Sequence, residues 1–315
     1  MVVSPHMPTL SATDELVARI QRLKAERQAV ILSHNYQIGE IQDVADFVGD
    51  SLELSRMAVE MPAKVIVFCG VHFMAETAAI LNPDKIVLLP DLDAGCSMAD
   101  MITVEQLRAL KAKHPGAVVV CYVNTTAAIK AESDYCCTSS NAVRVVEGIP
   151  RDREIIFIPD QFLGDYVAKQ TGRTLILYNG YCPVHYRIMA SDVAAMKAEH
   201  PAAEVLVHPE CPGEVHELAD QVLSTSGMCR AAKASSADEL IIATEIGILH
   251  RIEKENPDKR VYASCQWCDC SHMRVNTLEK ILWSLEDLQH VVRVPEEIRV
   301  RAVRALDRML AVAAS

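Results

Sequence analysis

The chain has 315 residues, half of them apolar, and it carries 31 basic against 42 acidic side chains, a net charge of −11. This acidic balance, without a run of lysines and arginines, disfavours binding to nucleic acid or to an anionic membrane. No segment reaches the roughly 18 apolar residues of a membrane span, and residues 1–10 lack a signal-peptide pattern, so we expect a cytoplasmic protein. Its 11 cysteines then indicate reduced thiols, metal ligands or redox groups instead of a disulfide scaffold.

The predicted elements repeat one order, a helix followed by three apolar strands. The helices cover residues 13–27, 103–114 and 191–200, each opening with a Ser or Thr cap and acidic residues. The first strands lie in residues 28–34, 116–123 and 203–209, the second in 64–70, 154–160 and 239–246, and the third in 85–91, 174–180 and 259–264. Nearly continuous apolar strands that alternate with helices are typical of parallel sheets covered on both faces.

This order predicts an α/β protein of three pseudo-threefold-related, Rossmann-like α/β/α units, with small parallel sheets around a central active site. The predicted units span residues 1–102, 103–190 and 191–315, and the last of them ends in two helices after residue 276. Polar clusters follow the strands of every unit. Because ligands of parallel α/β sheets bind beyond the carboxyl ends of the strands, we expect these clusters to share one crevice.

Each unit also repeats one series of chemical groups. A polar residue ends the first strand, a hydroxyl follows 17 residues later, and a cysteine comes 43 to 45 residues after the hydroxyl. The three series are His34, Ser51 and Cys96; Tyr122, Ser139 and Cys182; and His208, Thr225 and Cys270. A triplication of this kind predicts that the units deliver equivalent groups to equivalent places.

Cys96, Cys182 and Cys270 are the candidate metal ligands, because each follows a strand end in its own unit. Three converging thiolates suit a cubane iron–sulfur cluster and leave its fourth iron open to act as a Lewis acid. Two alternatives are a structural zinc, suggested by Cys265, Cys268, Cys270 and His272, and buried thiols without a ligand. The pair Cys265 and Cys268 is also a candidate redox dithiol, with two accessory thiols of no function as the alternative.

Six polar side chains at strand ends form the second candidate group, and we interpret them as ligand contacts: His34, Tyr36, Tyr122, Asn124, His208 and Glu210. Residues two apart on an extended segment point the same way, so they address one cavity in pairs. Ser51, Ser139 and Thr225 start helical patterns, where free N–H groups and a hydroxyl bind anions. This predicts small, doubly anionic substrates. His72 and His185 flank the site and fit packing as well as contact.

The motifs SHNYQ, DFVGDSLELS, CGVHFMAETAAIL, DAGCSMAD, YVNTTAAIKAESD, CTSSNA, NGYCPVH and HPEC together resemble those of the quinolinate synthase family. The resemblance runs in order from about residue 30 to residue 280. It implies an enzyme that condenses iminoaspartate with dihydroxyacetone phosphate to quinolinate for NAD biosynthesis. It also implies a [4Fe-4S] cluster on three cysteines, three α/β units, and an aspartate oxidase or dehydrogenase as the partner that makes iminoaspartate.

The resemblance also implies roles for individual residues. The cluster ligands correspond to Cys96, Cys182 and Cys270, and Tyr36 is implicated in catalysis. The substrate contacts correspond to His34, Ser51, Tyr122, Asn124, Ser139, His208, Glu210 and Thr225. Some members space the last cysteines as CxxCxxC, whereas this chain has one residue between Cys268 and Cys270, and the CxxMxxN pattern favours Cys270.

Both lines of reasoning lead to one expected mechanism. Glu210 is the first candidate for general base or acid, with His34, Tyr36 and His208 as its proton partners. One alternative is another three-cysteine cluster enzyme of triplicated fold, such as a diphthamide-type radical enzyme or a hydroxymethylbutenyl diphosphate reductase. The other alternative is a non-enzymatic iron–sulfur sensor, although this chain has no basic helix that could bind DNA.

Overall fold

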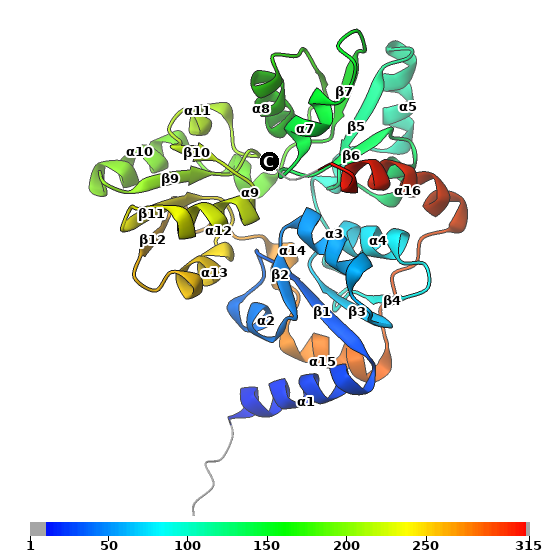
Figure 1. Cartoon of the computed structure of the whole chain (residues 1–315), viewed down its shortest axis with the longest axis vertical. Coiled ribbons are helices and arrows are strands. Elements are labelled where there is room, and N and C mark those ends of the chain that lie inside the picture. The colour runs from blue at the N-terminus through cyan, green and yellow to red at the C-terminus, as the bar shows by residue number, and fades with distance from the viewer. Residues whose placement is uncertain (1–10, 313–315) are drawn as a thin grey trace, which may run out of the picture.

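Twelve strands form three separate four-stranded sheets in the computed structural model, which describes residues 11–312. Every pairing within the sheets is parallel, and helices flank the sheets, so the α/β fold class predicted from the sequence is confirmed. The three sheets and their helices form three lobes around a common centre (Figure 1). All three sheets have the same order, in which the first strand lies between the second and the third and the fourth lies at the edge.

The first sheet carries the most completely buried strands. Its strands are β1 (Ala29–His34), β2 (Phe47–Gly49), β3 (Val65–Cys69) and β4 (Ile86–Leu88), in the order β2-β1-β3-β4. Its helices are α1 (Ala12–Glu26), α2 (Gly39–Val44), α3 (Ser51–Glu60) and α4 (His72–Leu81). Every residue of β1 and β3 is buried, as expected for parallel strands with both faces covered.

The second and third sheets repeat this arrangement. The 3-10 helix η1 (Ala99–Met101) follows Cys96 at the end of the first unit. The second sheet contains β5 (Val118–Tyr122), β6 (Tyr135–Cys137), β7 (Ile155–Ile158) and β8 (Ile176–Leu177). Its helices are α5 (Val104–Lys113), α6 (Ala127–Ala131), α7 (Ala142–Glu147), α8 (Gln161–Thr171) and α9 (Pro183–Tyr186). The third contains β9 (Glu204–Val207), β10 (Gln221–Val222), β11 (Glu239–Ala243) and β12 (Arg260–Ala263), with α10 (Ala190–Glu199), α11 (Gly213–His216), α12 (Thr225–Ala234), α13 (Ile248–Glu255) and α14 (Ser271–Arg274).

One aspartate in each unit explains why the start of the first strand is alike in all three. Asp46, Asp134 and Asp220 each precede the second strand of their unit, and each accepts a hydrogen bond of 2.8 Å from a backbone N–H of the first strand. The bond spans 15 residues every time. The repeat in the sequence is therefore also a repeat of hydrogen bonds, which holds the polar strand ends at equivalent points.

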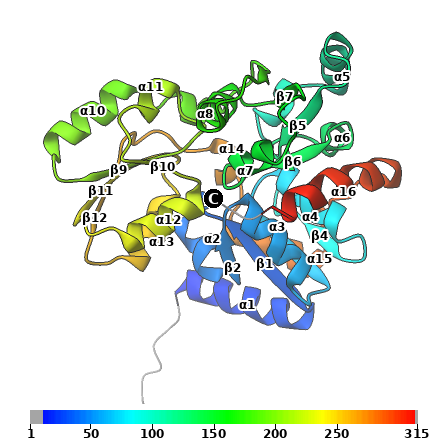
Figure 2. The same ribbon diagram turned by 45° about the horizontal axis from the view of Figure 1, so that its top comes forward.

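The two predicted C-terminal helices are present, but they pack outside the third unit. Helix α15 (Leu278–Asp287) packs against α1 and β3 of the first sheet, and α16 (Glu296–Leu310) packs against α6, β6 and α4 (Figure 2). Leu278, Ile281, Leu282 and Leu285 of α15 are buried in the core of the first unit. At roughly 1.5–3 kcal/mol for each buried side chain, this face accounts for the docking of α15. The predicted domain boundaries remain a prediction.

Two of the three predicted helix caps are wrong. Helix α1 is capped by Ser11, which forms a capping box with Asp14, so the cap lies two residues before the predicted start at residue 13. Helix α5 is capped by Thr103 as predicted. Helix α10 follows Met189 without a side-chain cap, because its Ser and Asp lie inside the helix. The general pattern located the helices correctly, whereas the polar residue nearest the start did not always supply the cap.

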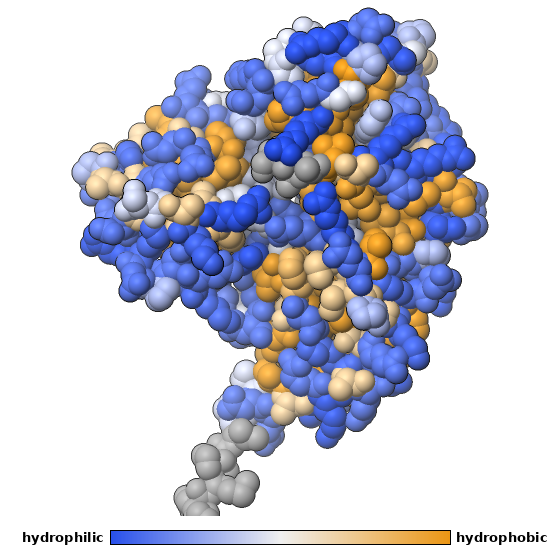
Figure 3. All heavy atoms as spheres, in the orientation of Figure 1, coloured by the Kyte–Doolittle hydropathy of each residue, from blue (hydrophilic) through white to orange (hydrophobic). Residues whose placement is uncertain are grey.

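Hydrophilic side chains dominate the face of the molecule seen in Figure 3, and apolar side chains gather mainly between the lobes and beside α16. Among the described residues, no helix has both the length and the hydropathy needed to cross a membrane.

Candidate active site

A cavity of about 150 Å³ lies where the ends of the first strands of the three units meet. It is lined by the three candidate metal ligands and by all of the polar residues proposed from the sequence, namely Cys96, Cys182, Cys270, His34, Tyr36, Ser51, Tyr122, Asn124, Ser139, His208, Glu210 and Thr225. His185 also lines the cavity, but His72 does not, and its side chain is 45% exposed. The fold thus brings the repeat-equivalent groups of three units into one place.

The hydroxyls of Ser51 and Thr225 are not helix caps. Ser51 is the first residue of α3, which is capped by Asp50, and Thr225 is the first residue of α12, which is capped by Ser224. Because the preceding residue caps the helix, both hydroxyls are left to line the cavity. Ser139 lies in the turn before α7.

The expected free N–H groups are only partly present at these helices. The Asp50 carboxylate accepts hydrogen bonds of 3.0 Å from the backbone N–H groups of Leu52 and Glu53, so it occupies the amino end of α3. The expectation that this helix end offers its amides to an anion is therefore wrong for those two groups. The hydroxyls remain the polar groups that these segments present to the cavity.

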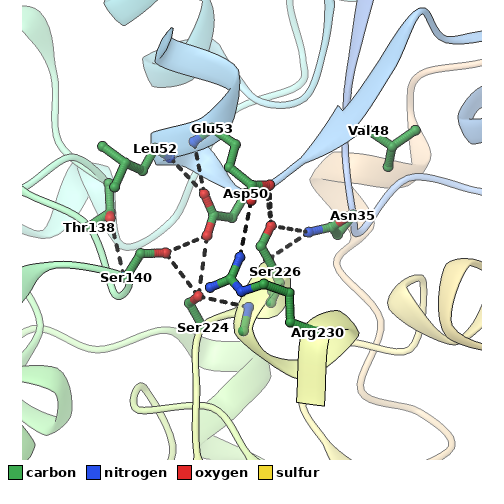
Figure 4. Close-up of polar contacts among 12 residues, drawn as sticks. Asn35, Val48, Asp50, Leu52, Glu53, Thr138, Ser140, Ser224, Ser226 and Arg230 are labelled. Atoms are coloured by element: carbon green, nitrogen blue, oxygen red, sulfur yellow. Dashed lines mark hydrogen bonds and ion pairs between the residues drawn. The ribbon is translucent and has the colours of Figure 1, made fainter. Parts of the chain in front are cut away.

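Asp50 also joins all three units beside the cavity (Figure 4). Its carboxylate accepts hydrogen bonds from Ser140 of the second unit and from Ser224 of the third, the latter at 3.2 Å, and the hydroxyl oxygens of Ser140 and Ser224 lie 2.9 Å apart. Asp50 is 5% exposed. Because Ser51, Ser139 and Thr225 are sequence neighbours of these three residues, the junction fixes the mutual positions of the three hydroxyls.

The backbone sets the tautomer of both strand-end histidines. The Tyr36 N–H donates to His34 Nδ1 at 3.2 Å, and the Glu210 N–H donates to His208 Nδ1 at 3.3 Å. A ring nitrogen that accepts a backbone hydrogen bond carries no proton, so both neutral rings carry theirs on Nε2. Burial lowers the pKa of His34 to about 4 and that of His208 to about 3. Both histidines are therefore neutral hydrogen-bond donors near pH 7.

Glu210 is the buried anion of the cavity. Burial raises its pKa, but His185, His208 and the Tyr122 hydroxyl outweigh burial and lower that pKa to about 2. Its Oε2 lies 2.9 Å from His185 Nδ1, and Tyr122 donates its hydroxyl hydrogen bond to Oε1. Burial and the Glu210 charge in turn raise the pKa of Tyr122 well above 10. Glu210 is thus a carboxylate at neutral pH that accepts hydrogen bonds, and for it to take a proton from a substrate the bound ligand must raise this low pKa, because a general base works best with a pKa near the operating pH.

A chain of contacts connects Glu210 with Tyr36 through His185. The other nitrogen of His185, Nε2, lies 3.2 Å from the Tyr36 hydroxyl and 2.8 Å from Thr244 Oγ1, and Thr244 lies 2.5 Å from the Tyr36 hydroxyl. Burial raises the pKa of Tyr36 well above 10, so this phenol holds its proton at neutral pH. A base and an acid are therefore joined by one imidazole that offers a nitrogen to each.

Thr244 was missed by the sequence analysis, which also left His185 undecided between packing and contact. The available signal was the polar pair Thr244 and Glu245 directly after β11 in the third unit. The loop after this strand approaches Tyr36 closely, since a Cβ on Gly247 would lie 2.5 Å from the Tyr36 carbonyl oxygen. Glycine therefore permits the approach that brings Thr244 to Tyr36.

The three candidate ligand cysteines share a local structure. Cys182 and Cys270 are the residues immediately before α9 and α14, and Cys96 lies shortly before η1. Burial raises the pKa of each of these thiols, and backbone N–H groups at the helix starts oppose that rise, for example those of Ala99 for Cys96 and of His185 for Cys182. None of the three is in a disulfide. Free thiols beside the N–H groups of a helical turn suit iron–sulfur ligands.

Cys265 and Cys268 form a disulfide with each other. The zinc site suggested by the local spacing is therefore wrong for this pair, because sulfurs bonded to each other are not thiolate ligands. The sequence hypothesis that the two thiols can close a disulfide agrees with this bond, while a redox role stays a prediction.

Comparison with known proteins identifies the family. The family described as "Quinolinate synthetase A protein" matches residues 18–311. The chain belongs to the quinolinate synthetase A family. It is 57% identical over 299 residues to a protein named quinolinate synthase from Dehalococcoides mccartyi strain CBDB1, covering 95% of this chain and 99% of the relative. Quinolinate synthase 1 of Methanosarcina acetivorans is 57% identical over 298 residues, with 95% and 98% coverage, and quinolinate synthase of Thermus thermophilus is 55% identical over 303 residues, with 95% and 98%.

Membership of the quinolinate synthetase A family establishes that the chain is an enzyme of NAD biosynthesis, a quinolinate synthase by kind. It also implies an iron–sulfur cofactor and small substrates. The described residues fit such a cofactor, since the ligand atoms of Cys182, His185 and Glu210 lie within 4.8 Å of one another and Cys96 and Cys270 line the same cavity. The radical-enzyme, reductase and sensor alternatives are therefore set aside.

Proposed function

We propose that this enzyme condenses iminoaspartate with dihydroxyacetone phosphate to quinolinate, with release of phosphate and water. The observation that carries the proposal is that one cavity gathers three free thiols, an ionised carboxylate, two neutral histidines and three hydroxyls from all three units. Two small anionic substrates need several hydrogen-bond donors, which the histidines and hydroxyls provide. A reaction that eliminates phosphate and water also needs an acid and a base.

Cys96, Cys182 and Cys270 are proposed to hold a [4Fe-4S] cluster. When bound, the cluster supplies an iron without a cysteine ligand, which polarises substrate oxygen or nitrogen as a Lewis acid. Glu210 lies beside this position, because its carboxylate is within 4.8 Å of the Cys182 sulfur.

Glu210 is proposed to take the proton from the substrate, and Tyr36 to give one to a leaving oxygen. His185 lies between the two, with one nitrogen 2.9 Å from Glu210 and the other 3.2 Å from Tyr36. Its Nδ1 makes no hydrogen bond among the described residues, so the proposed transfer of a proton from Glu210 to the phenol requires the ring to align with the carboxylate. His34 and His208 are proposed to hold substrate oxygens through their Nε2–H groups. Their low pKa values keep them neutral, so they donate without competing for the proton.

The remaining groups are proposed to bind the anionic parts of the substrates. Ser51, Ser139 and Thr225 would contact carboxylate or phosphate oxygens, and Tyr122 would orient Glu210 as well as the substrate. Asn124 lines the cavity, and its buried Oδ1 has no hydrogen-bond partner among the described residues. An unsatisfied buried acceptor costs about 1–3 kcal/mol, so a ligand that donates to it is favoured.

The cellular setting is proposed from the substrates. An aspartate oxidase or dehydrogenase would supply iminoaspartate, and the enzyme would act in the cytoplasm, where the thiols of a cluster site stay reduced.

The direct test is anaerobic purification, an absorption spectrum of the cluster, and an assay for quinolinate from iminoaspartate and dihydroxyacetone phosphate. We expect product with the cluster intact and none after the cluster has been removed by a chelator under oxygen. An intact cluster without any product would refute the proposed reaction.

A further inference from the structure

Asn35 separates two cavity residues but faces away from the cavity. His34 and Tyr36 on either side line the cavity, whereas the Asn35 side chain, which is fully buried, reaches from the first unit to the start of α12 in the third. Its Nδ2 donates a hydrogen bond of 2.8 Å to Thr225 Oγ1. Figure 4 shows Asn35 beside the Asp50 junction, pointing at the α12 segment.

Arg251 fixes the orientation of the Asn35 amide. Its guanidinium donates to Asn35 Oδ1 at 2.8 Å and to the Val48 carbonyl oxygen at 2.9 Å. A guanidinium only donates hydrogen bonds, so the atom that faces it is the amide oxygen and the amide nitrogen faces Thr225. The direction of each bond, from Arg251 to Asn35 and from Asn35 to Thr225, is therefore determined.

This direction decides what Thr225 offers to a ligand. Its hydroxyl oxygen already accepts from Asn35, and within residues 11–312 the hydroxyl proton has no acceptor in the protein. The proton is thus available to the cavity that Thr225 lines. Ser51 and Ser139 differ, because no side chain in the described part of the protein hydrogen-bonds to either hydroxyl.

We propose that Asn35, held by Arg251, is a positioning residue that makes Thr225 a dedicated hydrogen-bond donor to an anionic group of the substrate. This inference rests on the proposed function, in which Thr225 contacts substrate. It adds a preference, since a hydroxyl whose oxygen already accepts from Asn35 has its proton free for an acceptor such as a carboxylate or phosphate oxygen. The third unit thereby contacts an anionic group without a basic side chain at the contact.

The test is a double-mutant cycle that uses Asn35→Asp and Thr225→Val in the anaerobic, cluster-containing enzyme. An aspartate would accept from both Arg251 and Thr225, and so would turn the hydroxyl proton away from the cavity. We expect the Kd of quinolinate, measured by calorimetry, to rise about tenfold in Asn35→Asp, in line with the loss of one hydrogen bond to a charged group. KM should rise more than kcat falls, and the cluster spectrum should not change.

The second arm separates this mechanism from an effect of charge or packing. In the Thr225→Val background, Asn35→Asp should weaken quinolinate binding less than about twofold, because the hydroxyl that it redirects is gone. In the Thr225→Ser background, which keeps the hydroxyl, Asn35→Asp should again weaken quinolinate binding as it does with Thr225 present. Arg251→Met is the second variant, and it should weaken binding several-fold by releasing the amide. The control Glu255→Gln, which removes only the charge of the carboxylate paired with Arg251, should leave Kd unchanged.

The inference would be overturned, while the proposed function stands, if Asn35→Asp weakened quinolinate binding equally in the wild-type and Thr225→Val backgrounds, or in neither. A wild-type enzyme that neither binds nor makes quinolinate would instead refute the proposed function and this inference with it.

Discussion

Removing the Asp50 carboxylate should loosen all three units at once. In Asp50→Ala, helix α3 loses its cap, at about 1 kcal/mol, and Ser140 and Ser224 each lose a charged acceptor. A hydrogen bond to a charged group contributes about 1.5–3 kcal/mol, and the two bonds share one network, so we expect a total loss of about 4 kcal/mol. Asp50→Asn keeps one oxygen for the helix amides and should cost about 2 kcal/mol.

Differential scanning calorimetry of the anaerobic enzyme measures this loss as a fall in Tm. At about 2 °C per kcal/mol for a chain of this size, Asp50→Ala should lower Tm by about 8 °C. The matched control is Thr103→Ala, which removes an exposed capping box on α5 without a contact between units, and which should lower Tm by about 2 °C. If the two variants lowered Tm equally, the carboxylate would act only as a cap, and the reasoning about the junction would be refuted.

Three further outcomes are expected. Glu210→Gln should leave the cluster spectrum unchanged and lower kcat at least about a hundredfold, because an amide is no base; retained turnover would remove Glu210 from that role. Cys182→Ser should abolish the cluster absorbance, whereas Cys229→Ser, a buried thiol outside the cavity, should keep it. Arg108 and Arg301 lower the pKa of Glu132 from 4.5 to about 2, so its ion pairs add stability above pH 4.5 that is lost as the pH falls through about 2. Glu132→Gln should therefore cost about 1 kcal/mol at pH 7, a figure discounted for solvent screening, and almost nothing near pH 2, as scans of Tm against pH would show.

The sequence was sufficient to predict three strands in each unit, because buried parallel strands leave continuous apolar runs such as Val65–Cys69. It missed the second strand of each sheet, β2, β6 and β10, because these strands have only two or three residues and leave no such run. It was also sufficient to predict which cysteines line the cavity, because the repeat places Cys96, Cys182 and Cys270 at equivalent points, while their role as cluster ligands stays a prediction. The tail was predicted as two helices at the end of the third unit, whereas α15 packs on the first unit, since an apolar helix face shows that a helix docks and does not show on which unit.

Within the site, the sequence missed contacts that depend on packing between units. Thr244 meets Tyr36 only because the loop with Gly247 crosses from the third unit to the first. Asp50 was passed over in favour of Ser51, because a residue pattern does not show which of two neighbours caps a helix and which faces the cavity. Such choices follow from three-dimensional neighbours that no local pattern contains.

The Asp50 junction bears on how such a chain evolves. Asp50, Thr138 and Ser224 each precede the repeat-equivalent hydroxyl of their own unit, so they occupy matching positions in the triplication. In a ring of three identical subunits an acid at this position would occur three times at the axis, and the three charges would repel one another. Here only the first copy carries the acid. The second carries Thr138, whose hydroxyl oxygen accepts a hydrogen bond of 3.2 Å from the Ser140 N–H, and the third carries Ser224, whose hydroxyl donates to the acid. Because the three copies lie in one polypeptide, they can differ at this position, and no single unit, repeated three times, would rebuild this centre.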